Sequence, residues 1–361
     1  MSSPSLDIVI VGLSITSSWG NGHATTYRGL SYELSSRGHS VTFLERDVPW
    51  YSSNRDMPTL SGVNVRLYTS LEELKDTYTE VVKKADIVIV GSYVPDGVEV
   101  GDWVIKTAEG ITAFYDIDTP VTLTCLANNS CTYLGAHQIP NYDIYLSFSG
   151  GPVLQMLQHV YGSPNAKPLY CSVDPLNYYP GPDTRYHLGY MGTYSDDRQP
   201  TLEKLLIEPA RMWPEGEFIV AGPQYPESVE WPDNIRRIQH LPPSEHQRFY
   251  SSQRFTLNVT RADMIRAGYS PSVRLFEAAA CATPVISDYW EGLEEFFTPG
   301  KDILISHSAQ QTLMYLQQIS EEEAYLIGRK ARKRILSRHT AAHRAAELEH
   351  YVFESMRMVS A

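Results

Sequence analysis

The chain contains two successive series of short apolar runs that alternate with helical patterns. The first run, Asp7 to Gly12, is rich in β-branched residues and ends in glycine, which is typical of a strand buried on both faces of a parallel sheet. A helical pattern from His23 to Arg37 and an apolar run from Ser40 to Leu44 come next. Because parallel strands need such crossover connections, the pattern predicts an α/β fold with open, mostly parallel sheets.

The same alternation continues through both halves of the chain. Further strands of the first half are predicted at residues 63–68, 85–90, 111–115 and 142–148, with a helix at 71–84. In the second half, strands are predicted at residues 188–192, 217–221, 235–240, 255–259 and 284–287, with helices at 201–212, 244–251 and 272–281. We therefore predict two Rossmann-like, doubly wound domains that face a central cleft.

Length and a change in composition predict the domain organisation. A chain of 361 residues exceeds what one hydrophobic core usually covers, and residues 166–179 are enriched in Pro, Ser, Asn and Tyr, as in a hinge. We predict an N-terminal domain at residues 1–170, a C-terminal domain at 171–338 and a C-terminal helix at 339–361. This charged helix either packs back on the N-terminal domain or caps a solvent-facing surface.

Overall charge and cysteine content argue against several classes of protein. The net charge of -12 argues against nucleic acid as a partner, because phosphate backbones attract basic surfaces. The 4 cysteines form no CxxC pair, which argues against a zinc site and a disulfide framework. No segment reaches the roughly 18 to 20 apolar residues that span a bilayer, so we expect a cytoplasmic protein without an integral membrane segment.

Candidate catalytic residues follow predicted strands directly, where ligands of open α/β sheets bind. The loop that begins at Gly12 delivers His23 to the start of a helix, where the helix dipole favours a neutral imidazole that can accept a proton. Asp116 and Asp118 follow another strand and can bind sugar hydroxyls, act as a base or orient His23. A packing role for the histidine and a turn-forming role for the aspartates fit the same residue types.

Two segments of the second half suit a phosphorylated ligand. The residues from Gly192 to Tyr194 follow a strand and expose backbone amides, and the forked side chain of Arg198 can bind the same phosphate. Farther along, Ser272 begins a helix whose free amides can face a diphosphate, and Glu277 lies within an otherwise apolar part of that helix. A carboxylate in such a place indicates binding rather than packing.

These two segments resemble the C-terminal domain of GT-B glycosyltransferases of the group 1 type. Four segments are similar to the spore-maturation CgeB-like group within them: Trp19 to His23, Phe43 to Trp50, Tyr115 to Pro120 and Arg274 to Glu277. The similarity runs from about residue 8 to residue 300. It implies the two-domain GT-B fold, with the acceptor bound by the N-terminal domain and a nucleotide-sugar by the C-terminal domain.

The resemblance also implies individual roles. Glu277 would hold the ribose, the helix start would hold the diphosphate, and Arg261 would neutralise the leaving group. The implied donor-binding residues are Gly192, Thr193, Tyr194, Arg198, Gly222, Pro223, Arg261, Ser272, Val273, Arg274 and Glu277. Retaining relatives carry another glutamate eight positions before the ribose-binding one, whereas this chain has Tyr269 there. That departure leaves room for an inverting mechanism with His23 or Asp118 as the base.

We therefore predict a hexosyltransferase-like enzyme that moves a sugar from a nucleoside-diphosphate sugar to an acceptor hydroxyl. No metal is expected, because helix amides and arginines can offset the charge of the leaving group. Asp116 and Asp118 form a DxD pair in the formal sense, but they are assigned to the acceptor side. The alternatives are a GT-B-fold epimerase or phosphorylase, and a nucleotide-sugar-binding protein without catalysis.

Overall fold

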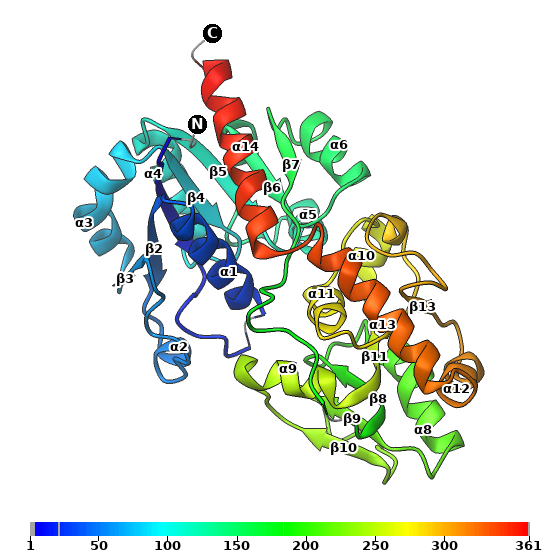
Figure 1. Cartoon of the computed structure of the whole chain (residues 1–361). Helices are drawn as coiled ribbons and strands as arrows, with labels where there is room; N and C mark the ends of the chain where they lie inside the picture. Colours follow the sequence, from blue (N-terminus) through cyan, green and yellow to red (C-terminus); the bar gives the residue numbers. More distant parts are fainter. Residues whose placement is uncertain (1–3, 21, 183, 360–361) are drawn as a thin grey trace. The chain divides into compact units, whose positions relative to one another are not determined.

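Two parallel sheets organise the chain, which is shown as a computed structural model in Figure 1. The structure describes residues 4–20, 22–182 and 184–359. An N-terminal unit comprises Met1–Cys171 together with Ala341–Ala361, and a C-terminal unit comprises Ser172–Thr340. Asn21, which belongs to the predicted Trp19 to His23 segment, lies outside the described residues.

The sheet of the N-terminal unit is doubly wound. Its strands are β1 (Asp7–Gly12), β2 (Ser40–Arg46), β3 (Val63–Tyr68), β4 (Ile87–Gly91), β5 (Ile111–Asp116), β6 (Ile144–Ser147) and β7 (Ala166–Pro168). Within the described residues they form a seven-stranded sheet in the order β3-β2-β1-β4-β5-β6-β7, with every neighbouring pair parallel. The order reverses between β1 and β4, the point where ligands bind in such sheets.

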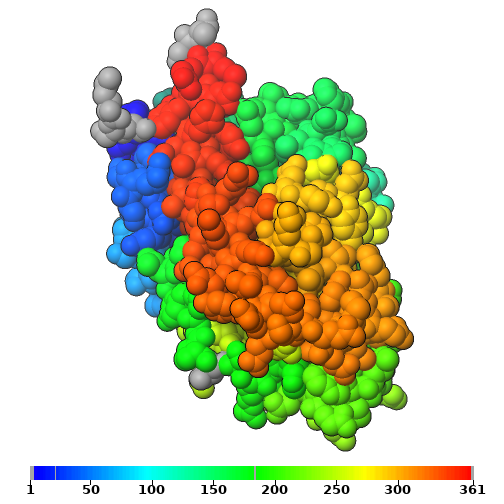
Figure 2. Space-filling model, turned by 45° about the vertical axis from the view of Figure 1, so that its right-hand side comes forward, coloured from blue at the N-terminus to red at the C-terminus, as the bar shows by residue number. Residues whose placement is uncertain are grey.

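Helices cover this sheet, and the last of them comes from the far end of the chain. They are α1 (His23–Ser36), α2 (Pro49–Ser52), α3 (Leu71–Lys84), α4 (Gly97–Thr107), α5 (Thr119–Ala127), the 3-10 helix η1 (Ala136–Asn141), α6 (Pro152–His159) and α14 (Ala341–Val359). Figures 1 and 2 show α14, in red, against the blue N-terminal segment of the same unit. A Cβ on Gly29 of α1 would come within 3.0 Å of the Ala341 Cβ, so the two helices are in close contact.

An ion pair ties α14 to the unit. The Glu349 carboxylate accepts hydrogen bonds from Arg37 Nε and Nη2 at 2.6 and 2.7 Å, and it lies 2.7 Å from His39 Nε2. Its pKa is lowered chiefly by the hydrogen bond from Arg37. The terminal helix is therefore held to the N-terminal unit by charge as well as by close packing.

The C-terminal unit repeats the doubly wound arrangement. Its strands are β8 (Tyr186–Met191), β9 (Phe218–Ala221), β10 (Ile235–Ile238), β11 (Gln253–Asn258), β12 (Val285–Ser287) and β13 (Leu304–Ile305). Among the described residues they form a six-stranded sheet in the order β10-β9-β8-β11-β12-β13, again with parallel neighbours. The order reverses between β8 and β11, and the carboxyl ends of the strands at such a reversal are where ligands bind in sheets of this kind.

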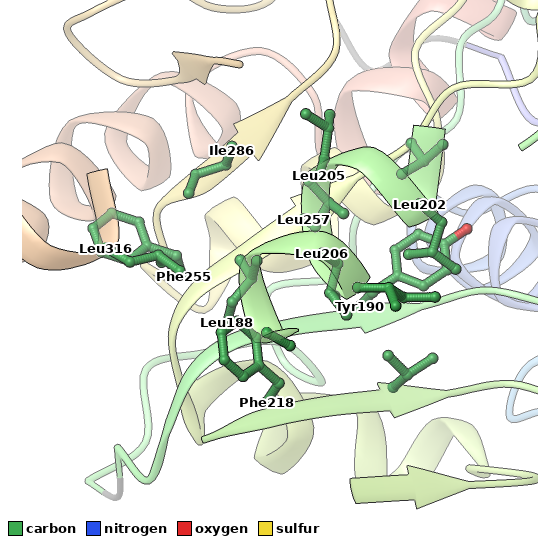
Figure 3. Packing of buried hydrophobic residues seen from close by; sticks show 14 of the residues in the cluster. Leu188, Tyr190, Leu202, Leu205, Leu206, Phe218, Phe255, Leu257, Ile286 and Leu316 are labelled. Atoms are coloured by element: carbon green, nitrogen blue, oxygen red, sulfur yellow. The ribbon is translucent and has the colours of Figure 1, made fainter. Parts of the chain in front are cut away.

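The core of this unit lies on one face of its sheet (Figure 3). Leu188, Phe218 and Phe255 project from three adjacent strands and meet Leu205 and Leu206 from a covering helical segment. All five are almost inaccessible to solvent. Full burial of each such side chain stabilises the fold by about 1.5–3 kcal/mol, so this cluster accounts for much of the rigidity of the strands.

The helices of the C-terminal unit include one interruption that the sequence pattern missed. They are α7 (Gln199–Leu202), η2 (Glu203–Ile207), α8 (Glu208–Met212), α9 (Pro243–Ser251), α10 (Ala262–Ala267), α11 (Val273–Ala280), the 3-10 helix η3 (Leu293–Glu295), α12 (Ala309–Gln318) and α13 (Glu321–Leu336). A single helix was predicted at residues 201–212, but η2 is a π-helix followed by Pro209 in α8. Because proline lacks an amide hydrogen, the regular hydrogen-bond ladder cannot continue through it.

The predicted fold class, two Rossmann-like parallel α/β sheets, is confirmed.

Figure 2 shows α12 and α13, in orange, on the outer surface of the C-terminal unit. Ser320 begins α13 with a capping box in which it and Glu323 bind each other's backbone amides. In the described part of the chain, no helix is both long enough and apolar enough to cross a membrane.

Candidate functional site

The loops after β8 and β9 run against each other at the carboxyl edge of the C-terminal sheet. Gly192 donates its amide hydrogen to the Ala221 carbonyl at 2.9 Å, and Tyr194 donates to the Pro223 carbonyl at 3.0 Å. Gly222 has φ +148, and a Cβ there would stand 2.0 Å from the Gly192 oxygen. Only glycine permits this contact, which brings together the loop of Gly192 and the loop of Gly222 and Pro223, both predicted to bind the donor.

Arg274 lies in the first turn of α11 and reaches across to these loops. Its Nε donates to the Met191 carbonyl at 2.6 Å, and its Nη1 donates to Asn258 Oδ1 at 2.8 Å. The guanidinium lies 4.8 Å from the centre of the Tyr190 ring, a distance at which a cation is attracted to the ring face. A Cβ on Gly192 would meet Nη2 at 3.0 Å, so the arginine is fitted closely against the glycine loop.

Two further arginines occupy the same edge. Arg198 donates from Nη2 to the Thr193 carbonyl at 2.6 Å. Arg237, in β10, donates to the Gly222 carbonyl at 3.2 Å and lies between two aromatic rings, 4.1 Å from the centre of Tyr225 and 4.0 Å from that of Trp231. Arg198, Arg237 and Arg274 are called the edge arginines below.

The edge arginines surround Tyr225. Burial raises the pKa of this tyrosine, and the charges of all three guanidinium groups oppose that rise. In the described residues, none of the three forms an ion pair with a carboxylate. Burial lowers the pKa of Arg237, and its Nε and Nη1 have no hydrogen-bond partner among the described atoms. Three cations without an ion-paired carboxylate form a site suited to a doubly charged ligand such as a diphosphate.

The start of α11 adds to this positive site. The Ser272 hydroxyl donates to Asn258 Oδ1 at 2.8 Å and makes no capping bond to its own helix. Since the first amide groups of a helix have no partner within it, the start of α11 can receive an anion. Asn258 therefore holds both Ser272 and Arg274, and it connects the end of β11 to the predicted diphosphate-binding segment.

Glu277 is buried in α11, with 3% of its surface exposed. Its Oε1 accepts a hydrogen bond from the Tyr178 hydroxyl at 2.8 Å, and its Oε2 accepts one from the Tyr250 hydroxyl at 3.0 Å. His246 Nδ1 lies 3.9 Å from Oε2. The structure thus rules out a solvated surface glutamate and places Glu277 on the same helix as Arg274, one turn farther on.

Two predicted positions differ from the rest of the donor site. Arg261 Nε lies 3.9 Å from Asp197 Oδ2, so a carboxylate already faces its charge. Tyr269, which replaces a glutamate of the retaining relatives, has φ 48 and donates its amide hydrogen to the Glu291 carbonyl at 2.6 Å. A Cβ on Gly292 would stand 2.4 Å from the Tyr269 ring, so this ring packs directly on the glycine.

In the N-terminal unit, His23 follows β1 and the two predicted aspartates end or follow β5, and these two strands lie on either side of β4. His23 opens α1 and stacks on the Tyr93 ring, with 5.8 Å between the ring centres. Tyr93 follows β4 and donates its hydroxyl hydrogen to Asp118 Oδ2 at 2.9 Å. The structure therefore brings His23 and Asp118 into one cluster through a tyrosine that the sequence analysis did not single out.

Asp116 has a different environment from Asp118. It is fully buried, and its carboxylate accepts hydrogen bonds from Tyr145 at 2.5 Å, Thr122 at 2.7 Å and the Asp118 amide at 3.3 Å. Burial raises the pKa of Asp116 to about 6, although the first two hydrogen bonds act against the rise. Within the described residues, neither aspartate belongs to a group of three side chains that could hold a metal ion.

The loop that delivers His23 is built on a buried carboxylate. Glu45 accepts hydrogen bonds from Ser14 Oγ, the Ile15 amide and both the amide and hydroxyl of Thr16, at 2.6 to 3.0 Å. Arg28 adds a hydrogen bond from Nε to the Ile15 carbonyl at 2.8 Å and a two-pronged ion pair with Asp56. The loop after β1 is therefore held from two sides.

Four contributing side chains were missed by sequence reasoning: Tyr93, Tyr178, Arg237 and Tyr250. Arg237 left no distinct signal, because the predicted strand at residues 235–240 also contains Gln239 and His240. Tyr93 has φ 65, which is uncommon for a residue other than glycine and marks a functional position only once the backbone is known. The other two tyrosines are ordinary core residues by pattern.

Comparisons with known proteins agree with this architecture. Residues 198–350 match the family model described as glycosyl transferase-like. No curated protein sequence matches the chain significantly. Among solved structures, sucrose-phosphate synthase from Thermosynechococcus elongatus is similar with a TM-score of 0.71 and 14% identity, over 98% of this chain and 100% of that chain.

Two other similar solved structures are complexes with UDP or UDP-glucose. HepE from Anabaena in complex with UDP and glucose has a TM-score of 0.71 and 12% identity, over 97% of this chain and 100% of that chain. An α-glucosyltransferase in complex with UDP-glucose and DNA containing an abasic site has a TM-score of 0.70 and 14% identity, with the same coverage. These similarities confirm the GT-B fold, and the family match places a glycosyl transferase-like segment where the donor site was predicted.

Proposed function

We propose that this chain is a glycosyltransferase that moves a hexosyl group from a nucleoside-diphosphate sugar to an acceptor hydroxyl. The observation that carries the proposal is the set of edge arginines, three guanidinium groups that act on Tyr225, one of them in the first turn of α11, with no carboxylate paired to them in the described residues. The glycosyl transferase-like match over residues 198–350 supports it. The resemblance of four segments to the CgeB-like group supports membership of that subgroup.

The donor half of the reaction belongs to the C-terminal unit. The bond between the anomeric carbon and the β-phosphate oxygen breaks, and the nucleoside diphosphate leaves with that electron pair. Arg274 and the first amides of α11 stabilise the negative charge that develops on the leaving oxygen, which is why we propose transfer without a metal. Gly222 and Pro223 border the base, and Glu277 binds the ribose.

The acceptor half belongs to the N-terminal unit. The acceptor oxygen bonds to the anomeric carbon and gives its proton to a base, for which Asp118 and His23 are the candidates. Tyr93 donates to one oxygen of Asp118, which orients the carboxylate. The buried Asp116 accepts the Asp118 amide hydrogen and so positions the backbone of that residue instead of contacting the acceptor.

Calorimetric titration tests the donor assignment. The titrated ligands are UDP, GDP, TDP and UDP-glucose. Wild-type protein should bind at least one of these nucleotides at a single site. Arg274→Ala and Glu277→Ala should each weaken that binding at least tenfold. If Glu277→Ala left donor binding unchanged, the ribose assignment would be wrong, and if no nucleoside diphosphate bound, the proposed function would be wrong.

Product analysis separates transfer from the other chemistries of this fold. With a nucleotide-sugar alone, a transferase should yield slow hydrolysis to free sugar, whereas an epimerase should yield a second nucleotide-sugar. Phosphate added to the same mixture would produce a sugar phosphate only if the enzyme were a phosphorylase. Binding of the donor with no turnover above background in the presence of a panel of acceptors would favour a binding protein without catalysis.

A further inference from the structure

We infer that Tyr178 and Tyr250 are positioning residues that orient Glu277 for the two hydroxyls of a ribose, and so set the preference for ribonucleotide over deoxyribonucleotide donors. This inference rests on the proposed function, because it concerns the same donor site. It adds two residues that neither the sequence pattern nor the family resemblance indicated. The role is argued from the hydrogen bonds of one buried carboxylate.

Each oxygen of Glu277 is held by one tyrosine. Tyr178 lies in the segment before β8 and donates to Oε1 at 2.8 Å, and Tyr250, near the end of α9, donates to Oε2 at 3.0 Å. Both tyrosines and the glutamate are buried. The carboxylate is thus fixed from two separate parts of the chain, and its plane cannot rotate without breaking one of these bonds.

The two hydroxyls are the main partners of the Glu277 charge. In the described residues, no lysine or arginine forms an ion pair with this carboxylate, and the nearest ionisable nitrogen is His246 Nδ1 at 3.9 Å. Burial and the Glu277 charge raise the pKa of both tyrosines well above the usual value, so both remain proton donors at every working pH. A buried carboxylate needs such donors to remain in place.

The two tyrosine hydrogen bonds leave acceptor capacity on both oxygens of Glu277. A carboxylate offers about four lone-pair sites, two on each oxygen. Since the tyrosines take one site on each oxygen, one site remains on each. The vicinal 2′- and 3′-hydroxyls of ribose present two donors for these two oxygens, whereas a 2′-deoxyribose presents only one.

The place of Glu277 on α11 fits this use. Glu277 follows Arg274 by three residues, and side chains at that spacing lie on the same face of a helix. A ligand whose diphosphate contacts the start of α11 and Arg274 therefore carries its ribose toward Glu277. His246 Nδ1 lies 3.2 Å from the Tyr178 hydroxyl, farther than the 2.8 Å to Glu277, so we assign the tyrosine proton to the glutamate.

The test compares UDP with 2′-deoxy-UDP by calorimetry, and GDP with 2′-deoxy-GDP if the wild type prefers guanine. Wild-type protein should bind the ribonucleotide at least tenfold more tightly. Tyr178→Phe and Tyr250→Phe should each reduce that ratio by about three- to tenfold, mainly by weakening the ribonucleotide. Tyr179→Phe is the matched control. Tyr179 follows Tyr178 in the chain and is 51% exposed, so its substitution should leave the ratio of the two affinities unchanged.

Other outcomes separate this inference from the function it rests on. If the wild type binds UDP tightly and both phenylalanine variants keep its full ratio, the tyrosines are structural and the inference is wrong while the function stands. Equal weakening of both nucleotides also contradicts it, since a general loss of structure would have that effect. Absence of binding to any nucleoside diphosphate overturns both. Tyr250 is fully buried, so the less buried Tyr178 decides the result if Tyr250→Phe fails to fold.

Discussion

Arginines are used in opposite ways at the two sheet edges. In the N-terminal unit, Arg28 forms a two-pronged ion pair with Asp56, and Arg55 pairs with Asp47 at 2.6 Å, so the charges near the loop after β1 are neutralised within the fold. In the C-terminal unit, the edge arginines contact backbone carbonyls, an amide oxygen and aromatic rings, and no carboxylate among the described residues. Paired arginines stabilise a loop, whereas unpaired ones leave positive charge available for a ligand.

The comparison also covers the buried carboxylates. Glu45 receives four hydrogen bonds from the loop after β1, and Asp116 receives three from its own sheet and the following helix. Glu277 receives only two, both from tyrosines. A carboxylate with few donors retains acceptor capacity, so the C-terminal unit has both the arginines without an ion pair and the least saturated of these three carboxylates.

The largest expected effect is that of Arg274→Ala on turnover. Loss of a preorganised cation beside the leaving group should lower kcat/KM for sugar transfer by about 10²–10³-fold, measured with saturating acceptor. Arg274→Lys should recover part of this loss, since it keeps the charge but not the fork. Arg211→Ala, which removes a surface ion pair with Glu203 in the same unit, is the control and should retain wild-type kcat/KM. Equal activity of the two alanine variants would contradict the distinction between paired and unpaired arginines.

Arg28→Met should act on stability and leave the donor site intact. Breaking a largely buried ion pair leaves the partner charge uncompensated, so we expect a loss of about 2–3 kcal/mol in the free energy of unfolding. Burial acts to raise the pKa of Asp56, but the hydrogen bonds from Arg28 and Ser18 and the charge of Arg28 outweigh it and lower this pKa to about 2, so the charged form is the stabilised one. Urea denaturation measures the loss, and Arg46→Met, at an exposed pair with Asp96, should cost less than about 1 kcal/mol. If Arg28→Met weakened the affinity for UDP and left the free energy of unfolding unchanged, Arg28 would be a binding residue and not a stabilising one.

Asp116→Asn should change the pH dependence of stability. Because the folded pKa of about 6 lies above the unfolded value of 3.8, the native state holds its proton more tightly, and the associated stabilisation is present below pH 4 and is lost as the pH rises through 6. The asparagine variant lacks this titration. The free energy of unfolding of Asp116→Asn minus that of wild type should therefore increase by about 2 kcal/mol between pH 4.5 and pH 7. The exposed Asp76→Asn is the control, and a difference that stays constant with pH would refute the assignment.

Arg237→Met should have the smallest effect. The side chain keeps its packing between Tyr225 and Trp231 but loses the charge, so stability should hardly change. Affinity for UDP should fall by about tenfold, because one of three cations is lost, and the loss should shrink at high salt as the remaining attraction is screened. Unchanged affinity at low salt would show that Arg237 is a packing residue and would reduce the site to two arginines.

Local pattern was enough to predict most of the strands. The apolar run from Asp7 to Gly12 and the helix from Leu71 to Lys84 coincide with β1 and α3 at both ends. Short or polar elements such as β13, with two residues, and α10 were missed, because they bury too little surface to leave a periodic signal. The π-helix before Pro209 shows how one residue without an amide hydrogen alters a helix that its neighbours favour.

Residue types by themselves left the candidate site partly ambiguous. Asp116 and Asp118 are two positions apart and looked equivalent in sequence. In the structure, however, Asp116 is buried and accepts a hydrogen bond from Tyr145, whereas Asp118 accepts one from Tyr93. Arg261 looked as suitable for a diphosphate as Arg198, but Asp197 faces it. Burial and the identity of neighbours depend on which loops meet, and that information is not local.

The alternation of strands and helices, the glycines at strand ends and the Ser272 to Glu277 helix start are properties of consecutive residues, so the sequence alone determined the fold class and the sheet edge at which we propose a ligand site. The tertiary structure decided which arginines lack a carboxylate and what holds Glu277. Its two tyrosine partners lie 99 and 27 residues away along the chain, and only the order of the strands and the packing of α9 and α11 bring them together.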